Sequence, residues 1–362
     1  MFELRIKKLR ALLAEENLDA VLISAVSNIT YFTGYANFSQ DEREAYIFLG
    51  QNFGYIITDA RYCESIKKQV PHLQLFERSP GKRIDALFKK HKKQIKKLGI
   101  EEDNLVVSEH KILQKHFKKL KHFNASLLRS IKSEDEIQKI EKAANLGDQV
   151  FKYILGKIKA GISEKQLAQE LESYIKKHGA ELSFPPIVAF GKNSSIPHHQ
   201  TGNTKLTGDK EFILLDFGVK FENYCSDMTR TVFFGKPTKE QKAIFETVLK
   251  AQQKAINFVN SAIKSGKELK AAQVDKVARD YIISKNYPAV PHSLGHGVGL
   301  DVHESPRLSR QSREILKEGM VFSIEPGIYS EGFGGVRIED LFVLEKKGIR
   351  QLTNATKKLI TI

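Results

Sequence analysis

Five side chains of the kind that binds divalent cations occur in the C-terminal half of the chain. Four are carboxylates and one is an imidazole: Asp216, Asp227, His296, Glu325 and Glu339. Several of the carboxylates stand inside or at the end of an apolar, strand-like run, where burying a charge costs free energy unless a counter-ion is present. Oxygen-rich sites with one imidazole suit ions such as Mn²⁺, Co²⁺ or Zn²⁺. Because the four carboxylates can bridge ions or bind through both oxygens, the set predicts a two-metal site.

The segments that carry the carboxylates form a weak internal repeat. The run 212–218 contains Asp216 and resembles the run 321–327, which contains Glu325, while a further acid follows each run at a similar spacing. Two helical patterns joined at an Ile-Lys-Ala-Gly or Ile-Lys-Ser-Gly tetrapeptide precede each run. A duplicated unit of two helices and a hairpin would bring the four acids together across a pseudo-twofold axis.

The elements before the repeat predict a separate N-terminal domain. Residues 1–127 alternate helical and strand-like patterns, as α/β domains do. Strands are predicted at 19–24, 46–49 and 54–58, and helices around Leu9, Ile66 and Leu87. Ser133 begins a long helix, because Glu136 three residues later completes a capping box. A chain of 362 residues is also long for one core, so we expect two domains, 1–127 and 128–362.

The net charge of +15 is concentrated in one stretch of the N-terminal domain. Between Lys82 and Lys121 there are thirteen Lys or Arg against five Asp or Glu, which accounts for more than half of the excess. The stretch 89–97 is typical of the exposed side of a helix, with an apolar side formed by Ile84, Leu87, Phe88, Ile95 and Leu98. Nucleic-acid binding would require aromatic residues among these charges or a known binding module, so no nucleic-acid partner is expected.

Composition and thiol content indicate a cytoplasmic protein. No apolar run approaches the ~20 residues of a membrane span, and the first residues lack the charged, apolar and small-residue order of a signal peptide. The two cysteines, Cys63 and Cys225, lie far apart in the sequence and form no metal-type pair. We expect free thiols in a reducing compartment and no association with a membrane.

Taken in order, these motifs resemble those of the pita-bread metallopeptidases, in the group of Xaa-Pro aminopeptidases and prolidases. The resemblance covers nearly the whole chain. It implies an α/β fold with a creatinase-like N-terminal domain and a pita-bread catalytic domain that contains a pseudo-twofold duplication. It also implies that all five side chains bind a dinuclear metal centre, with Asp227 and Glu339 reaching both ions. Manganese is the expected metal, with cobalt or zinc as alternatives, and the family resemblance implies a homodimer.

Three further histidines acquire roles from the same resemblance. His198 matches a Pro-His pair whose imidazole faces the scissile bond, although the loop length leaves His199 as an alternative. His292 is expected to contact the proline side of the substrate. His303, in a glycine-rich neighbourhood that follows the metal-binding histidine, is expected to hydrogen-bond the substrate carbonyl or the gem-diolate formed from it.

The implied reaction is hydrolysis of the peptide bond before a proline, by attack of a hydroxide that bridges two metal ions. His303, with His198, is expected to stabilise the oxyanion, and Glu325 to transfer a proton to the leaving nitrogen. Because proline has no N–H and a fixed ring, a shaped pocket can select proline-containing peptides. Arg337 shares a strand face with Glu339, so we expect it to order the acids rather than to contact substrate.

Two activities within this group fit the metal motifs. An aminopeptidase releases the first residue of Xaa-Pro-Yaa peptides, and the runs 28–35 and 57–62 resemble small bacterial-type enzymes with this activity. A prolidase cleaves Xaa-Pro dipeptides and must bind their carboxylate with a cation placed just past the proline. Arg61 could supply that cation, but its setting resembles the aminopeptidase group, so aminopeptidase activity is expected and prolidase is the alternative.

Other functions on this fold are less consistent with the residues present. A methionine aminopeptidase usually lacks the large N-terminal domain, and a creatinase would not need five intact ligands. A catalytically silent binding protein would be expected to have lost ligands, whereas all five are present.

Overall fold

The polypeptide folds into two compact units, Met1–Arg129 and Ser130–Ile362. The computed structural model describes all of residues 1–362. No helix in either unit has the length and apolar character needed to cross a membrane.

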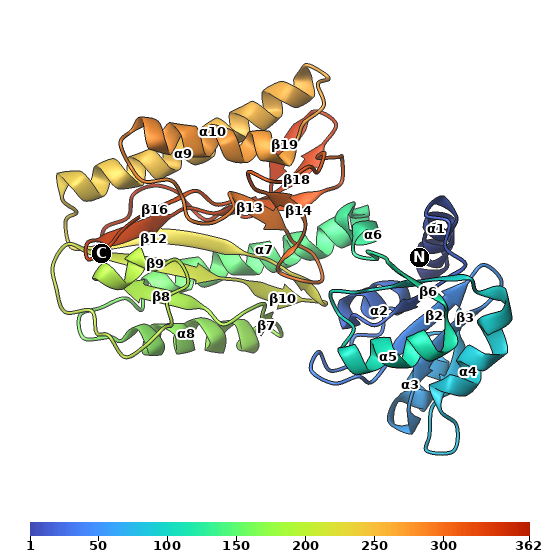
Figure 1. Ribbon diagram of the computed structural model, residues 1–362. Helices are drawn as coiled ribbons and strands as arrows, with labels where there is room; N and C mark the ends of the chain where they lie inside the picture. Colours follow the sequence, from blue (N-terminus) through green and yellow to red (C-terminus); the bar gives the residue numbers. More distant parts are fainter. The chain divides into compact units, whose positions relative to one another are not determined.

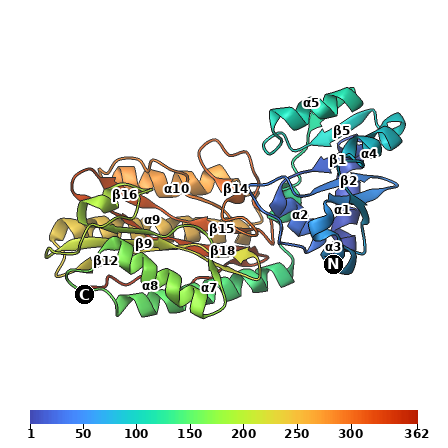
Figure 2. The same cartoon turned by 90° about the horizontal axis from the view of Figure 1, so that it is seen from below.

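The N-terminal unit is built on a six-stranded sheet with the order β4-β3-β2-β1-β5-β6. Its strands are β1 (Ala20–Ile23), β2 (Tyr46–Gly50), β3 (Gly54–Thr58), β4 (Gln74–Glu77), β5 (Lys97–Ile100) and β6 (Lys119–His122). Its helices are α1 (Phe2–Glu15), α2 (Val26–Thr33), α3 (Ala60–Gln69), α4 (Ile84–His91) and α5 (Val107–His116), and α6 (Leu127–Ser130) follows. Helices α4 and α5 lie on one face of the sheet, and α1 and α3 on the other (Figure 2). The strands predicted in this part of the sequence and the helices predicted around Leu9 and Ile66 are confirmed.

One predicted helix in this unit is wrong beyond its first two turns. Helix α4 ends at His91, a short 3₁₀ turn (Lys92–Gln94) follows, and Leu98 lies in strand β5. The apolar spacing that suggested one helix also fits a helix, a turn and a buried strand, because β5 pairs in parallel with β1 and β6. The prediction that Lys89, Lys90, Lys92, Lys93 and Lys96 are exposed is confirmed.

The C-terminal unit repeats one arrangement twice. The first copy consists of α7 (Glu134–Leu155), α8 (Glu164–Lys177) and the antiparallel strands β8 (Ile187–Phe190), β9 (Glu211–Phe217) and β12 (Met228–Phe234). The second consists of α9 (Lys239–Lys264), α10 (Ala271–Ser284) and the antiparallel strands β13 (Gly295–Gly297), β15 (Val321–Ile324) and β18 (Asp340–Glu345). The sheet orders β8-β9-β12 and β13-β15-β18 correspond, which agrees with the repeat found in the sequence.

Shorter strands complete the C-terminal unit. They are β7 (Glu181–Leu182), β10 (Val219–Phe221), β11 (Tyr224–Cys225), β14 (Glu304–Leu308), β16 (Gly327–Ser330), β17 (Gly334–Arg337) and β19 (Gly348–Gln351). A 3₁₀ turn (Gly191–Ser195) follows β8. The long helix α7 begins as predicted, because the Ser133 amide donates to the Glu136 carboxylate at 3.0 Å.

Two apolar cores lie on opposite sides of the strands of the C-terminal unit. Figure 1 shows α9 and α10 on one side of the strands and α8 on the other. One core joins α9 and α10 to the second set of strands, and the other joins α7 and α8 to β8, β9 and β12. The strands are therefore buried on both faces, which explains why polar groups among them need partners.

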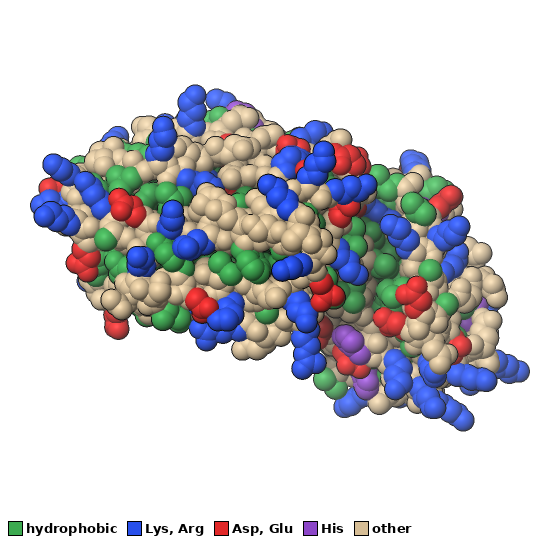
Figure 3. Space-filling model, turned by 90° about the horizontal axis from the view of Figure 1, so that it is seen from above, with side chains coloured by type: hydrophobic (Ala, Val, Ile, Leu, Met, Phe, Trp, Pro, Cys, Tyr) green, Lys and Arg blue, Asp and Glu red, His purple; other side chains and the backbone are tan.

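The surface of the C-terminal unit carries mixed charges. On the face seen in Figure 3, the basic side chains of this unit are scattered among acidic and uncharged residues. The positive charge visible there is distributed in the manner of an ordinary hydrated surface.

Candidate metal centre

The two hairpins of the C-terminal unit each place two carboxylates near one end of a strand pair. Asp216 lies in β9 opposite Thr229 of β12, and Asp227 immediately precedes β12. In the second copy, Glu325 follows the last residue of β15, and Glu339 immediately precedes β18. A hydrogen bond of 3.1 Å from the Glu339 amide to the Thr229 carbonyl joins the two hairpins. The acids of both copies therefore meet where the hairpins touch.

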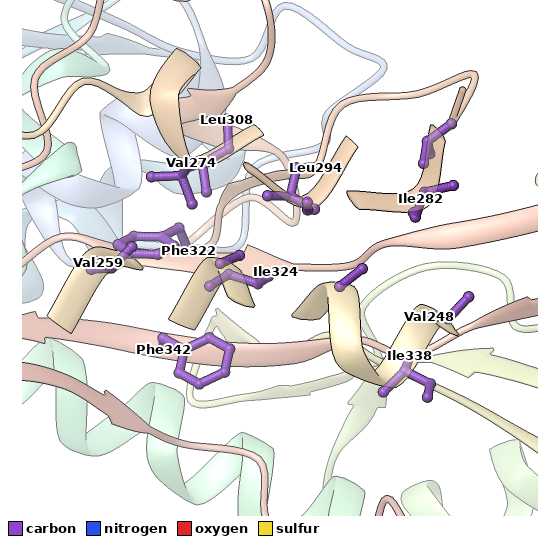
Figure 4. Packing of buried hydrophobic residues seen from close by; sticks show 14 of the residues in the cluster. Val248, Val259, Val274, Ile282, Leu294, Leu308, Phe322, Ile324, Ile338 and Phe342 are labelled. Atoms are coloured by element: carbon purple, nitrogen blue, oxygen red, sulfur yellow. The ribbon is translucent and has the colours of Figure 1, made fainter. Parts of the chain in front are cut away.

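Core residues next to the predicted ligands fix their direction. Ile324 and Ile338, which directly precede Glu325 and Glu339, are buried in the core formed with α9 and α10 (Figure 4). Successive strand residues point to opposite faces. Anchoring Ile324 and Ile338 in the core therefore turns their neighbours Glu325 and Glu339 away from those helices.

The five predicted side chains converge. The Nε2 atom of His296 lies 3.3 Å from Glu325 Oε1 and 3.6 Å from Asp227 Oδ2. Potential ligand atoms also lie within 4.8 Å of one another in the groups Asp216–Asp227–Glu339 and His296–Glu325–Glu339. Glu339 belongs to both groups. Two adjacent cation positions that share a carboxylate are therefore compatible with this arrangement.

Two oxygens within the cluster have no partner in the protein. Oδ1 of Asp227 and Oε1 of Glu339 are buried and accept no hydrogen bond. The other carboxylate oxygen of Glu339 accepts from the Thr229 hydroxyl at 2.7 Å. Because a buried, unpaired carboxylate oxygen is costly, these two atoms fit divalent cations of the hard or borderline kind.

The acids repel one another in the absence of cations. Burial and the neighbouring carboxylates raise the pKa of Asp227 well above its usual value, with Glu339 the largest of those neighbours. The same two causes raise the pKa of Glu339 to about 8. Burial alone would lower the pKa of His296, but the Glu325 carboxylate raises it to about 9. Burial likewise disfavours the charged form of Glu325, yet hydrogen bonding and attraction to His296 lower its pKa to about 2.

Arg337 holds the cluster from behind, as the sequence predicted. Its Nη2 donates to Asp216 Oδ2 at 2.5 Å, and its Nε donates to the Thr229 hydroxyl at 3.0 Å. Its Nη1 donates to the Tyr329 hydroxyl at 2.8 Å and to the Pro197 carbonyl at 3.3 Å. With all of these contacts made inside the protein, Arg337 orders the acids and the loop beside them.

A second buried arginine was missed in the sequence. Arg230 pairs with Asp340 at 2.5 Å and donates to the backbone carbonyls of Thr229 and Glu339. Asp340 also accepts from Gln252 at 3.0 Å. A charged residue within the apolar strand 228–234 was a signal of such a buried pair, because an isolated charge is not stable there.

The predicted substrate-facing histidines occupy distinct positions. His292 Nε2 lies 2.9 Å from the Tyr329 hydroxyl, and burial lowers its pKa. His303 is next to the cluster, since its ring stands perpendicular to that of His296 with centroids 4.2 Å apart. One of its nitrogens also lies within 4.8 Å of ligand atoms of Asp227 and His296. Burial and the nearby His296 lower the pKa of His303, which favours a neutral imidazole near pH 7.

His198 and His199 differ in their surroundings. His199 is mostly buried, and its Nε2 lies 3.0 Å from the fully buried carboxylate of Glu164. His198 is exposed and is close enough to His292 and His303 to affect their pKa values. Of the two alternatives left open by the sequence, His198 therefore has the free imidazole on the side of the metal centre.

A surface arginine near the centre was also missed. Arg307 of β14 lies opposite His296 of β13 in the sheet register, so the two side chains share a face. Arg307 is exposed, its Nε donates to the Ser293 hydroxyl at 3.0 Å, and its charge acts on His303. Only the strand pairing brings this cation to the site. By contrast, Arg61 in the N-terminal unit is engaged by Asp59 at 3.0 Å and Glu44 at 3.4 Å.

Comparison with known families places this architecture in one class. Residues 138–346 match the model of metallopeptidase family M24, and residues 5–131 match that of the creatinase/prolidase N-terminal domain. The chain belongs to metallopeptidase family M24 and is a peptidase. The predicted α/β fold with a creatinase-like N-terminal domain and a family catalytic domain is confirmed.

Individual relatives extend over the whole chain. The uncharacterized peptidase YqhT of Bacillus subtilis is 36% identical over 371 residues, which covers 99% of this chain and 100% of the relative. The solved Xaa-Pro dipeptidase of Bacillus anthracis is 33% identical with a TM-score of 0.92 and 100% coverage of both chains. The X-Pro aminopeptidase of Thermotoga maritima is also 33% identical, with a TM-score of 0.84 and coverage of 99% and 100%. These neighbours carry different activity names, and their similarity to this chain leaves the length of its peptide substrate open.

Proposed function

We propose that the protein is a two-metal exopeptidase that cleaves the bond between an N-terminal residue and a following proline. The observation that carries this proposal is the convergence of four carboxylates and His296, with unpaired buried oxygens on Asp227 and Glu339. Manganese is the proposed metal, and cobalt and zinc fit the same donors. Two such ions would supply a water ionised near neutral pH and positive charge for the carbonyl oxygen.

The protein's own side chains have separate tasks in this proposal. A neutral His303 donates a hydrogen bond to the oxygen of the scissile carbonyl, and the exposed His198, close enough to affect the pKa of His303, faces the same bond. Glu325, beside His296 in the cluster, accepts a proton and passes it to the leaving nitrogen. His292, held by Tyr329, contacts the proline side of the substrate.

Arg307 favours a dipeptide as the substrate. The sequence-based expectation of aminopeptidase activity depended on the runs 28–35 and 57–62 and on the lack of a free cation just past the proline in the catalytic half. The guanidinium of Arg337 donates hydrogen bonds only to groups inside the protein. Arg307, by contrast, is an exposed cation on the same sheet face as His296. A guanidinium can bind a carboxylate through two parallel hydrogen bonds. We therefore infer prolidase-type activity on Xaa-Pro dipeptides, with aminopeptidase activity on Xaa-Pro-Yaa peptides as the second candidate.

Matched peptides with and without Yaa separate the two candidates. Metal-loaded wild-type protein, Arg307→Ala and the exposed control Arg310→Ala are compared by kcat/KM on Xaa-Pro and Xaa-Pro-Yaa. Arg307→Ala should lower dipeptide turnover by roughly 10-fold or more, as expected for a lost charge-assisted contact, and leave the tripeptide unaffected. Equal losses on both peptides, or a wild-type preference for the tripeptide, would reject the dipeptidase and support the aminopeptidase.

A further inference from the structure

The carboxylate of Glu164 lies at the centre of a hydrogen-bonded joint outside the metal cluster. Glu164 is in the first turn of α8, and its side chain has no exposed surface. Its Oε1 accepts from the Phe190 amide at 2.9 Å and from Asn193 Nδ2 at 2.8 Å. Its Oε2 lies 3.0 Å from His199 Nε2 and accepts from the Gly202 amide at 3.1 Å. All four partners belong to one segment, residues 190–202.

The backbone of α8 fastens the continuation of the same segment. The Glu164 amide donates to the Thr204 carbonyl at 3.0 Å, and the Lys165 amide donates to the Gly202 carbonyl at 2.8 Å. Amides in the first turn of a helix have no partner within the helix, so this loop supplies them. A carboxylate at a helix N-terminus is also favoured by the helix dipole. The segment is therefore attached to α8 by side chain and backbone together.

The other side of the segment is attached to β17, the strand that ends two residues before Glu339. The Arg337 guanidinium, which also binds Asp216, donates to the Pro197 carbonyl. The Gly335 amide donates to the Ser194 hydroxyl at 2.8 Å. Pro197 is therefore linked through Arg337 to Asp216 of the metal centre, and His199 contacts Glu164 of α8. His198 lies between these two fixed residues.

We propose that Glu164 and His199 act as positioning residues that hold His198 in place beside the metal centre. His199 is the only ionisable partner of the buried Glu164 carboxylate, and its ring prevents residue 199 from rotating. Rotation about the backbone at this point would move His198 directly, because the two residues are adjacent. The effect on turnover rests on the proposed peptidase function, whereas the effect on the loop does not.

The mildest test removes only the His199 contact. His199→Ala, His199→Gln and the matched control Gln200→Ala, an exposed residue of the same loop, are compared in the metal-loaded enzyme on an Xaa-Pro peptide. His199→Ala should lower kcat by roughly 10-fold with the bound-metal content unchanged. His199→Gln, whose amide can donate to Glu164, should recover most of the loss, and Gln200→Ala should leave kcat unchanged. In a His198→Ala background, His199→Ala should have almost no further effect, since it acts through the residue already removed.

Amide hydrogen exchange tests, without any substrate, whether the contact between Glu164 and His199 holds the loop in place. His199→Ala should speed exchange at the Gly202 and Phe190 amides, and His199→Gln should restore their protection. Multiplicative losses in the double variant, failure of glutamine to rescue, or unchanged exchange would each overturn the proposal. In one further outcome, the wild type hydrolyses no Xaa-Pro peptide while the exchange results are as expected. That outcome would reject the peptidase function and support the positioning of the His198 loop by Glu164 and His199.

Discussion

The two copies of the repeat in the C-terminal unit contribute alike in carboxylates and unlike in histidines. Each copy places one acid at or just past the end of one strand, β9 or β15, and one just before the strand paired with it, β12 or β18. Only the second copy places an imidazole, His296, on the third strand of the set; the corresponding β8 carries none. Duplication thus accounts for the symmetric acid pairs, and the added histidine makes the two cation positions chemically different.

The helices of the two copies also hold histidine loops by different means. In the first copy, Glu164 of α8 accepts hydrogen bonds from the loop that carries His198. In the second, Asp275 and Arg279 of α10 form a buried pair at 2.7 Å. Arg279 donates to the His292 carbonyl at 2.9 Å, and Asp275 accepts from the Leu294 amide at 3.1 Å. The corresponding helices α8 and α10 therefore hold loops that carry histidines from different turns and with different chemistry.

The largest effect is expected from removing one acid of each copy. Asp227→Ala and Glu339→Ala should each lose at least one metal ion per chain and lower kcat/KM by at least roughly 10³-fold, because we propose that both acids bind both ions. Metal analysis and peptide hydrolysis are measured together, with the exposed Glu331→Ala as the control. Full metal content with normal turnover in either variant would show that the replaced residue is not a metal ligand. The two copies would then not contribute equal pairs of acids to the centre.

A smaller effect is expected at His303, which follows β13 in the second copy as His198 follows β8 in the first. His303→Ala should lower kcat by ~10²-fold with unchanged metal content, as the loss of a hydrogen-bond donor to the oxyanion does. Because His303 lies near Asp227 and His296, the alternative role is that of a metal ligand. An emptied metal site in His303→Ala would show that the residue is a ligand or a support and that the assigned role is wrong.

The smallest effect concerns pH and the mutual repulsion of the two acid pairs. Glu339, with its pKa raised to about 8 from 4.5, destabilises the metal-free fold as pH rises. The stabilisation from His296 is complete below its unperturbed pKa of 6.5 and is lost as pH rises through about 9. Both groups lower the free energy of unfolding as pH rises. The Tm of the metal-free protein should therefore fall by several degrees between about pH 6 and pH 9. Scanning calorimetry of Glu339→Gln should give a flatter profile, and a flat wild-type profile would contradict these pKa shifts.

The sequence predicted the parts of the site that local patterns encode. Asp216 and Glu325 stand at similar points of repeated apolar runs, and the Ser133 capping box is complete within four residues. The lysine-rich stretch after α4 was predicted wrongly because helical and turn-strand spacings coincide there. Arg307, Glu164 and Arg230 were missed, since each depends on strand register or on contacts between segments far apart in the chain. No local signal places Arg307 opposite His296 or Glu164 beneath His199.

Metal reconstitution measured with matched peptides tests the central claim most directly. The chelated protein is titrated with Mn²⁺ while bound metal and hydrolysis of Xaa-Pro and of the same dipeptide without proline are recorded. A dinuclear centre assembled from both copies predicts no activity without metal and two ions per chain at saturation. The proposed function predicts turnover of the proline peptide only. Saturation at a single ion, or undiminished hydrolysis after chelation, would contradict a dinuclear centre assembled from both copies.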